Sequence, residues 1–229
     1  MAISPITKQI LTNLQKEYVF ADFQINSQGY LIKRNKRDLL SLETERWTAA
    51  IFDSCTLMRF RPLLSARHDI LHRWFEKKYK PTSRYQYKRS TVMCDLEYGE
   101  FYSDGRNYNE EYKRLRDAII PTSAEFIEKY SSMEGLYWHR VVPIMRGERD
   151  IPTIAPDNML SFLTLTRIVA PENYSLFKDF VIEKYNAVQG FLNLSIAQSY
   201  WVEQLQEITQ NERFGQLRRE AKGEEKPLM

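Results

Sequence analysis

The longest hydrophobic repeat in the sequence follows Pro171 and runs toward the C-terminal end. Its apolar residues recur every three to five positions, which places them along one side of an α-helix. They are Phe177, Val181, Tyr185, Val188, Leu192, Ile196, Trp201 and Leu205. Gly190 interrupts the repeat and costs a helix about 1 kcal/mol relative to alanine, which favours a kink or a break there. The repeat predicts a long helical segment that packs on the rest of the chain or is offered to a partner.

Shorter stretches of the chain carry further helix and strand signals. Capping residues and apolar spacing predict helices over 5–14, 41–60, 65–80, 109–133 and 158–170, the fourth interrupted at Pro121 and the last capped by Asp157. Alternating polar and apolar residues predict hairpins over 23–33 and 83–105. We therefore expect an α+β protein that is predominantly α-helical: a helical body, one or two small β-hairpins and the long C-terminal helical segment.

Proline and glycine interrupt the stretch 135–156, which predicts a connector. The expected organisation is a mixed helix and hairpin domain over 1–134, followed by the connector and a C-terminal helical region over 157–229 packed on the first domain. A single domain is the alternative, since the chain has only 229 residues.

Positive charge is concentrated between Arg59 and Arg89. These 31 residues hold ten Lys and Arg against Asp69 and Glu76, a balance of +8, whereas the whole chain sums to +3. Five aromatic residues lie in the same segment, namely Trp74, Phe75, Tyr79, Tyr85 and Tyr87. Lys and Arg neutralise phosphates, and aromatic rings stack on exposed bases. The segment therefore predicts a basic and aromatic face that contacts nucleic acid or an acidic protein neighbour.

The candidate binding residues of this face are Arg67, Arg73, Lys77, Lys78, Arg84, Lys88, Arg89, Tyr85 and Tyr87. An acidic stretch over 95–111 follows, with six acids against Arg106 and a balance of −5. Neighbouring strands of opposite charge stabilise each other when they pair. The alternative interpretation is therefore that the basic and acidic stretches neutralise each other within the fold.

His68 and His72 form the sharpest local pattern, because two histidines four residues apart on a helix can share a metal ion. His139, Glu97 or Glu100 could supply a third ligand. The cations around the pair disfavour a dication, so we interpret both histidines as ordinary residues at the edge of an apolar face. Asp95, Glu97 and Glu100 also suggest a nuclease cluster, although acids that alternate along a strand are common. We predict no catalytic residue, no metal and no cofactor.

The sequence therefore favours a non-enzymatic structural or assembly subunit of a larger complex, viral or nucleoprotein in kind. Its partners would be other protein subunits, as a homo- or hetero-assembly, and nucleic acid. A free-standing nucleic-acid-binding regulator and a metal-dependent hydrolase using His68 and His72 are the alternatives. No apolar run approaches the 18 residues of a membrane span, and Cys55 and Cys94 lack CxxC spacing. We expect a cytoplasmic protein, or a virion component, without membrane contact.

Overall fold

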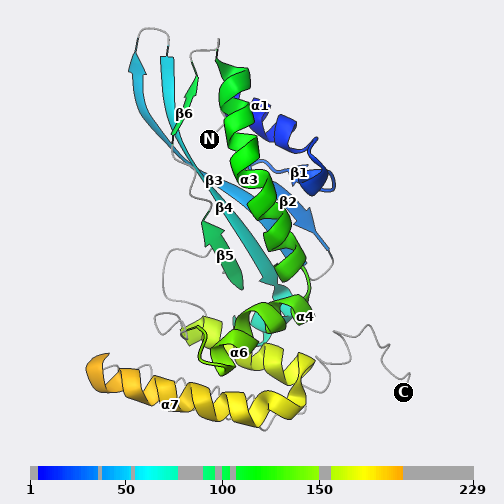
Figure 1. Cartoon of the computed structure of the whole chain (residues 1–229), viewed down its shortest axis with the longest axis vertical. Helices are drawn as coiled ribbons and strands as arrows, with labels where there is room; N and C mark the ends of the chain where they lie inside the picture. Colours follow the sequence, from blue (N-terminus) through cyan, green and yellow to red (C-terminus); the bar gives the residue numbers. More distant parts are fainter. Residues whose placement is uncertain are drawn as a thin grey trace. The chain divides into compact units, whose positions relative to one another are not determined.

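The computed structural model describes residues 5–35, 38–52, 55–76, 90–95, 100–103, 107–149 and 156–192 (Figure 1). The chain forms two compact units that alternate along the sequence. Unit 1 combines Met1–Arg67 with Lys88–Ser131, and unit 2 combines His68–Tyr87 with Ser132–Met229. The chain passes from unit 1 to unit 2 after Arg67 and again after Ser131.

Unit 1 is organised around a sheet of six strands. The strands are β1 (Gln24–Ile25), β2 (Leu31–Arg34), β3 (Asp38–Phe52), β4 (Cys55–His68), β5 (Val92–Asp95) and β6 (Glu100–Ser103). The order is β1-β2-β3-β4-β5, and β6 also pairs with β4. The pairs β1–β2, β2–β3, β4–β5 and β4–β6 are antiparallel. β4 therefore carries two short partners on successive stretches, β6 at Thr56–Arg59 and β5 at Leu63–Ala66.

One face of this sheet forms the core of unit 1. Residues opposite each other in an antiparallel pair share a face, as Leu31 does with Leu42 and Ala66 with Val92. All four are at most 5% exposed. The helices α1 (Pro5–Leu14) and α3 (Tyr108–Tyr130) add further buried side chains, namely Ile10, Leu11, Leu14, Leu115, Ile119 and Phe126. Burial of each large aliphatic side chain stabilises the fold by about 1.5–3 kcal/mol.

The expectation of a predominantly helical protein with one or two small hairpins is wrong. Residues 41–60 and 65–68 were expected to be helical, and the structure places 41–52, 55–60 and 65–68 in the long strands β3 and β4. The predicted helix over 65–80 begins only at Asp69, as α2 (Asp69–Glu76). Pairing explains the difference, because the first part of β3 gains ladder partners on β2, with Leu42 opposite Leu31, and β4 gains partners on β5 and β6. Such tertiary contacts override a weak local helix preference.

The sequence predicts an interruption at Pro121, but α3 is not divided there. The helix runs through it without a break for 23 residues. Proline inside a helix removes one hydrogen bond and costs about 3 kcal/mol. Leu115 and Ile119 before it, and Phe126 after it, are all buried. Their burial on the same helix offsets that cost.

Unit 2 is built around the helix α6 (Pro156–Val169). Every residue from Ser161 to Thr166 is buried. α6 contacts α2, α4 (Met133–Leu136), the π-helix η2 (Tyr137–Val141), the 3-10 helix η3 (Pro171–Asn173) and α7 (Tyr174–Leu192). A short helix, α5 (Val142–Met145), continues η2.

Unit 2 contains the stretch expected as a connector and the start of the predicted C-terminal helical segment. The stretch 135–156, expected as a connector, is helical in its first part, because the helical run that begins at Met133 continues to Met145. The run ends near Gly147, whose φ of +71° suits glycine. α7 begins the predicted C-terminal segment, with Phe177 and Val181 each 1% exposed. The rest of that segment, from residue 193 on, lies outside the described residues.

Candidate functional site

The basic segment is divided between different elements. Arg59 and Arg67 lie on β4, and Arg73 lies on α2. The structure does not describe the side chain of Arg73. The other candidate residues lie outside the described residues, namely Lys77, Lys78, Arg84, Lys88, Arg89, Tyr85 and Tyr87. Of the nine candidate residues of the basic face, the structure therefore describes the side chain of Arg67 alone.

Arg67 lies in the interior rather than on the surface. It is 3% exposed and stands two residues after Ser65, so both point to the same face of β4. The hydroxyls of Ser65 and Ser41 share a buried hydrogen bond of 2.7 Å on that face. A buried guanidinium is retained where the protein itself satisfies its charge. Arg67 is thus a structural cation and is not presented to an external polyanion.

Part of the acidic stretch pairs with the basic one. The antiparallel register of β4 and β6 sets Glu100 opposite Arg59, and that of β4 and β5 sets Asp95 opposite Leu63. Residues opposite each other in a sheet have Cβ atoms about 5 Å apart. The register therefore sets one acidic residue, Glu100, opposite one basic residue, Arg59, as expected if the basic and acidic stretches neutralise each other within the fold.

His68 and His72 do not share a helix. His68 is the last residue of β4, whereas His72 lies on α2, and they are 1% and 0% exposed. The Nδ1 atom of His72 lies 3.5 Å from the hydroxyl of Ser161 on α6, and that serine is also fully buried. Within the described ranges, no group of three or more His, Cys, Asp and Glu could hold a metal ion. In its described surroundings, His72 is thus a buried residue of the packing contact between α2 and α6.

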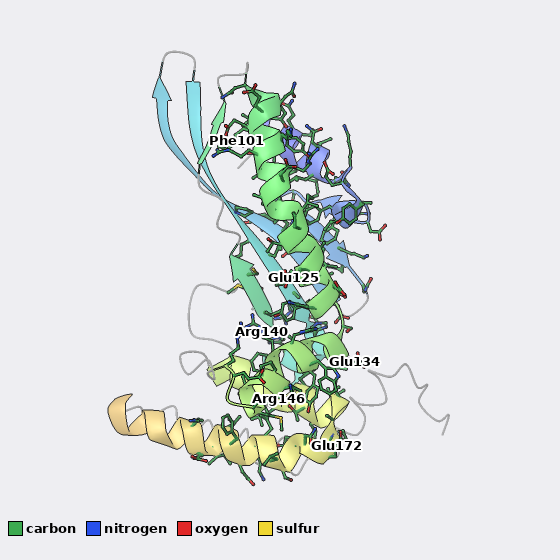
Figure 2. The ribbon with its side chains drawn as sticks, in the orientation of Figure 1. Phe101, Glu125, Glu134, Arg140, Arg146 and Glu172 are labelled. Carbon is green, nitrogen blue, oxygen red and sulfur yellow. The ribbon has the colours of Figure 1, made fainter. Side chains whose placement is uncertain are left out.

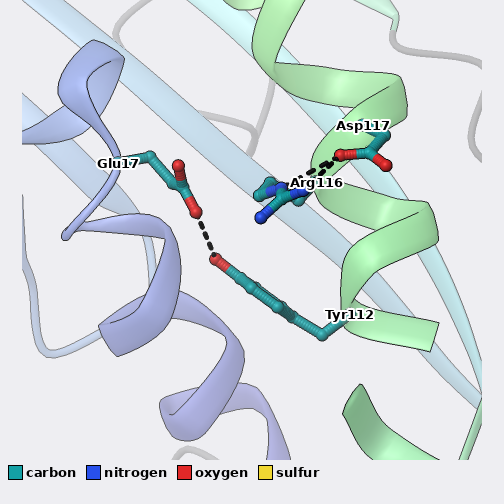
Figure 3. Close-up of polar contacts among 4 residues, drawn as sticks. All are labelled: Glu17, Tyr112, Arg116 and Asp117. Carbon is teal, nitrogen blue, oxygen red and sulfur yellow. Dashed lines mark hydrogen bonds and ion pairs between the residues drawn. The ribbon is translucent and has the colours of Figure 1, made fainter. Parts of the chain in front are cut away.

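A polar cluster joins α1 and the turn that follows it to α3 (Figure 3). The Tyr112 hydroxyl donates to Glu17 Oε1 at 3.3 Å, and Asn13 Nδ2 donates to the Tyr108 hydroxyl at 3.1 Å. The two tyrosine rings stack, with centroids 6.1 Å apart. Arg116 beside them pairs with its neighbour Asp117 at 2.7 Å.

The chemistry of this cluster is that of a structural contact. Burial raises the pKa of the Tyr112 hydroxyl well above its usual value, and the neighbouring Glu17 carboxylate raises it further. Burial also raises the pKa of Tyr108, although its hydrogen bond with Asn13 acts in the opposite direction. Both phenols therefore stay protonated at neutral pH and hold α1 against α3. Neither is suited to act as a base or nucleophile.

The sequence analysis missed an exposed aromatic residue on unit 2. Trp138 lies in the π-helix η2 and is 60% exposed, whereas its neighbour Tyr137 is 3% exposed. Asn173 at the end of η3 donates from Nδ2 to the Tyr137 hydroxyl at 2.9 Å. π-helical turns are rare in proteins, and those that do occur are often found at functional sites. Figure 2 labels Glu134, Arg140 and Arg146 along the same helical stretch.

Three other large apolar side chains are exposed in the described residues: Tyr18 at 76%, Met93 at 57% and Leu176 at 65%. Leu176 belongs to unit 2 and follows Asn173 by three residues. The signal that could have identified Trp138 is the run Tyr137-Trp138-His139-Arg140, which sets aromatic beside basic residues. It was missed because the stretch was interpreted as a connector.

No family model, curated protein or solved structure matches this chain. In the part of the chain that the structure describes, no helix has both the length and the apolar character needed to cross a membrane.

Proposed function

We propose that this chain is a non-enzymatic assembly subunit that contacts a neighbouring subunit through unit 2. The observation that carries the proposal is the 60% exposure of Trp138. An exposed tryptophan keeps a large apolar ring in water, and burying that ring at an interface contributes a favourable free energy of transfer out of water. Tryptophan and arginine are the residues most enriched among the dominant contacts of protein interfaces.

The surroundings of Trp138 support an interface rather than an accident of packing. Tyr137, Val141 and Ile144 on the same helical stretch are buried at 3%, 0% and 1%, so the helix is firmly seated. The Asn173–Tyr137 hydrogen bond fixes the stretch to the end of η3, directly before α7. Trp138 is therefore held outward on a rigid support, which lowers the entropy lost when a partner binds.

Nucleic-acid binding is a second candidate function, supported by the +8 balance of residues 59–89. Burial removes Arg67 from the proposed contact residues. Six cations remain in the proposal, namely Arg73, Lys77, Lys78, Arg84, Lys88 and Arg89. An acidic neighbouring subunit would satisfy the same charges. The hydrolase alternative loses support, because its two candidate histidines do not share a helix and no group of three or more possible ligands lies together in the described residues.

Sedimentation velocity over a range of concentrations tests the assembly proposal. The unmodified chain should form species larger than its mass of 27.3 kDa. Trp138→Ala should weaken this association by about 30-fold, the effect of a typical dominant interface residue. Tyr18→Ala is the matched control, because Tyr18 is also an exposed aromatic residue but belongs to unit 1. A Trp138→Ala chain that associates as strongly as the unmodified chain would contradict the proposal.

A further inference from the structure

The helical stretch from Met133 to Arg146 has distinct inner and outer sides. Leu136, Tyr137, Val141 and Ile144 are 0–3% exposed and define the inner side, and α6 contacts both α4 and η2. The outer side carries four residues spaced by four. Glu134, Trp138 and Arg146 are exposed, and Val142 is half-buried.

The π-helical turn keeps these four residues on one side. In an α-helix four residues span more than one turn, so a side chain four positions later points about 40° further around the helix axis. A π turn holds more than four residues, so over the same four positions the side chain direction shifts the opposite way. The Val142 N–H donates to Tyr137 O, five residues earlier, whereas the Arg146 N–H donates to Val142 O at 3.0 Å. The step from Trp138 to Val142 therefore offsets the drift of the α-helical steps on either side.

The order of residues on this outer side is self-complementary. It reads acid, aromatic, aliphatic and base from Glu134 to Arg146, with Trp138 and Val142 between them. When two copies of such a helix lie antiparallel about a two-fold axis near position 140, residue 134 faces residue 146 and residue 138 faces residue 142. Each contact then occurs twice, as a two-fold interface requires.

We propose that the outer side of α4, η2 and α5 binds the same side of a second copy of this chain in this antiparallel arrangement. The inference rests on the proposed assembly function and names its partner and contact. Trp138 of each copy covers Val142 of the other, and Glu134 of each copy pairs with Arg146 of the other. The existing contact of Arg146 with Glu148 is 3.9 Å long, between side chains that are 63% and 58% exposed. Exposed pairs of this kind contribute little, so this contact does not compete strongly.

Charge reversal tests the arrangement. Glu134→Arg alone sets two cations against each other at both contacts, and Arg146→Glu alone sets two acids against each other. Each single variant should self-associate at least tenfold more weakly than the unmodified chain. An equimolar mixture of the two variants restores opposite charges at both contacts. Sedimentation velocity should therefore show a mixed 1:1 dimer where each variant alone is monomeric.

Controls separate this inference from a general effect of charge. Glu128→Arg and Lys113→Glu reverse exposed charges on α3 in unit 1 and should leave self-association unchanged. Circular dichroism confirms that each variant is folded. If the unmodified chain associates but the single variants match it, or if the mixture stays monomeric, the antiparallel contact is wrong and the assembly function stands. An unmodified chain that is monomeric at every concentration would overturn both.

Discussion

Single buried polar residues decide where this fold is most sensitive to substitution. His72 is fully buried between α2 and α6 and lies next to the Ser161 hydroxyl. His72→Ala removes a large side chain from this contact, and we expect a loss of about 2–4 kcal/mol from the cavity. Urea unfolding measures it. Ser161→Ala, which removes only a hydroxyl, should cost less than about 1.5 kcal/mol, and equal losses for the two variants would contradict the packing role of His72.

Ser123 on α3 should behave in the opposite way. Its side chain is buried, and its Oγ atom finds no hydrogen-bond partner in the described part of the chain. An unsatisfied buried hydroxyl costs about 1–3 kcal/mol, and alanine is the better helix former. Ser123→Ala should therefore be neutral or stabilising by up to about 1 kcal/mol in thermal unfolding.

Ser132→Ala provides the contrast at an exposed serine. Ser132 caps α4 by accepting a hydrogen bond from the Gly135 N–H at 3.0 Å. Its removal should destabilise the protein by about 0.5–2 kcal/mol. A Ser123→Ala variant that is destabilised as much as Ser132→Ala would show that the Ser123 hydroxyl is satisfied after all.

At the scale of elements, the contact between α3 and the turn that follows α1 makes stability depend on pH. Tyr112→Phe removes the hydrogen bond to Glu17 and should cost about 1 kcal/mol at pH 7. The folded-state pKa of Tyr112 is raised above its ordinary value of 10.0. The unfolded chain therefore releases this proton first, and the folded state loses stability as the pH rises above about 10.

Removing the phenol should remove this part of the pH dependence. We expect the stability of Tyr112→Phe to fall less steeply above pH 10 than that of the unmodified chain, as measured by urea unfolding at pH 8 to 11. Tyr18→Phe is the control, because Tyr18 is 76% exposed. Parallel curves for the unmodified chain and Tyr112→Phe would contradict the contact.

The elements that could be predicted from the sequence are those whose own residues determine them. The helix over 5–14 and the start of the C-terminal segment show a periodicity that burial then follows, and the mostly apolar helix after Asp157 is buried at every residue from Ser161 to Thr166. The long strands β3 and β4 could not be predicted in this way, because they depend on β2, β5 and β6 as pairing partners. The burial of Arg67 was missed for the same reason. Its charge suggested a surface, whereas its place on β4 sets it beside Ser65 in the interior.

At the scale of the whole molecule, the segregation of charge predicts how polyanions bind. If the six cations from Arg73 to Arg89 in the proposal contact phosphates on duplex DNA, log affinity should fall with log salt with a slope of about −5. Neutralising Lys77 and Lys78 together to glutamine should reduce this slope by up to about two. Titrations with mixed-sequence DNA and RNA at several salt concentrations measure it. No binding at low salt would leave an acidic protein neighbour as the partner of this segment.

The distribution of exposed and buried aromatic residues leads to the central claim, that the chain works as a subunit joined through unit 2. Sedimentation equilibrium of the unmodified chain tests this claim most directly, because it measures mass without reference to shape. We predict a weight-average mass that rises above 27.3 kDa with concentration and approaches twice that value. A mass that stays at 27.3 kDa up to the highest concentration reached would contradict the claim.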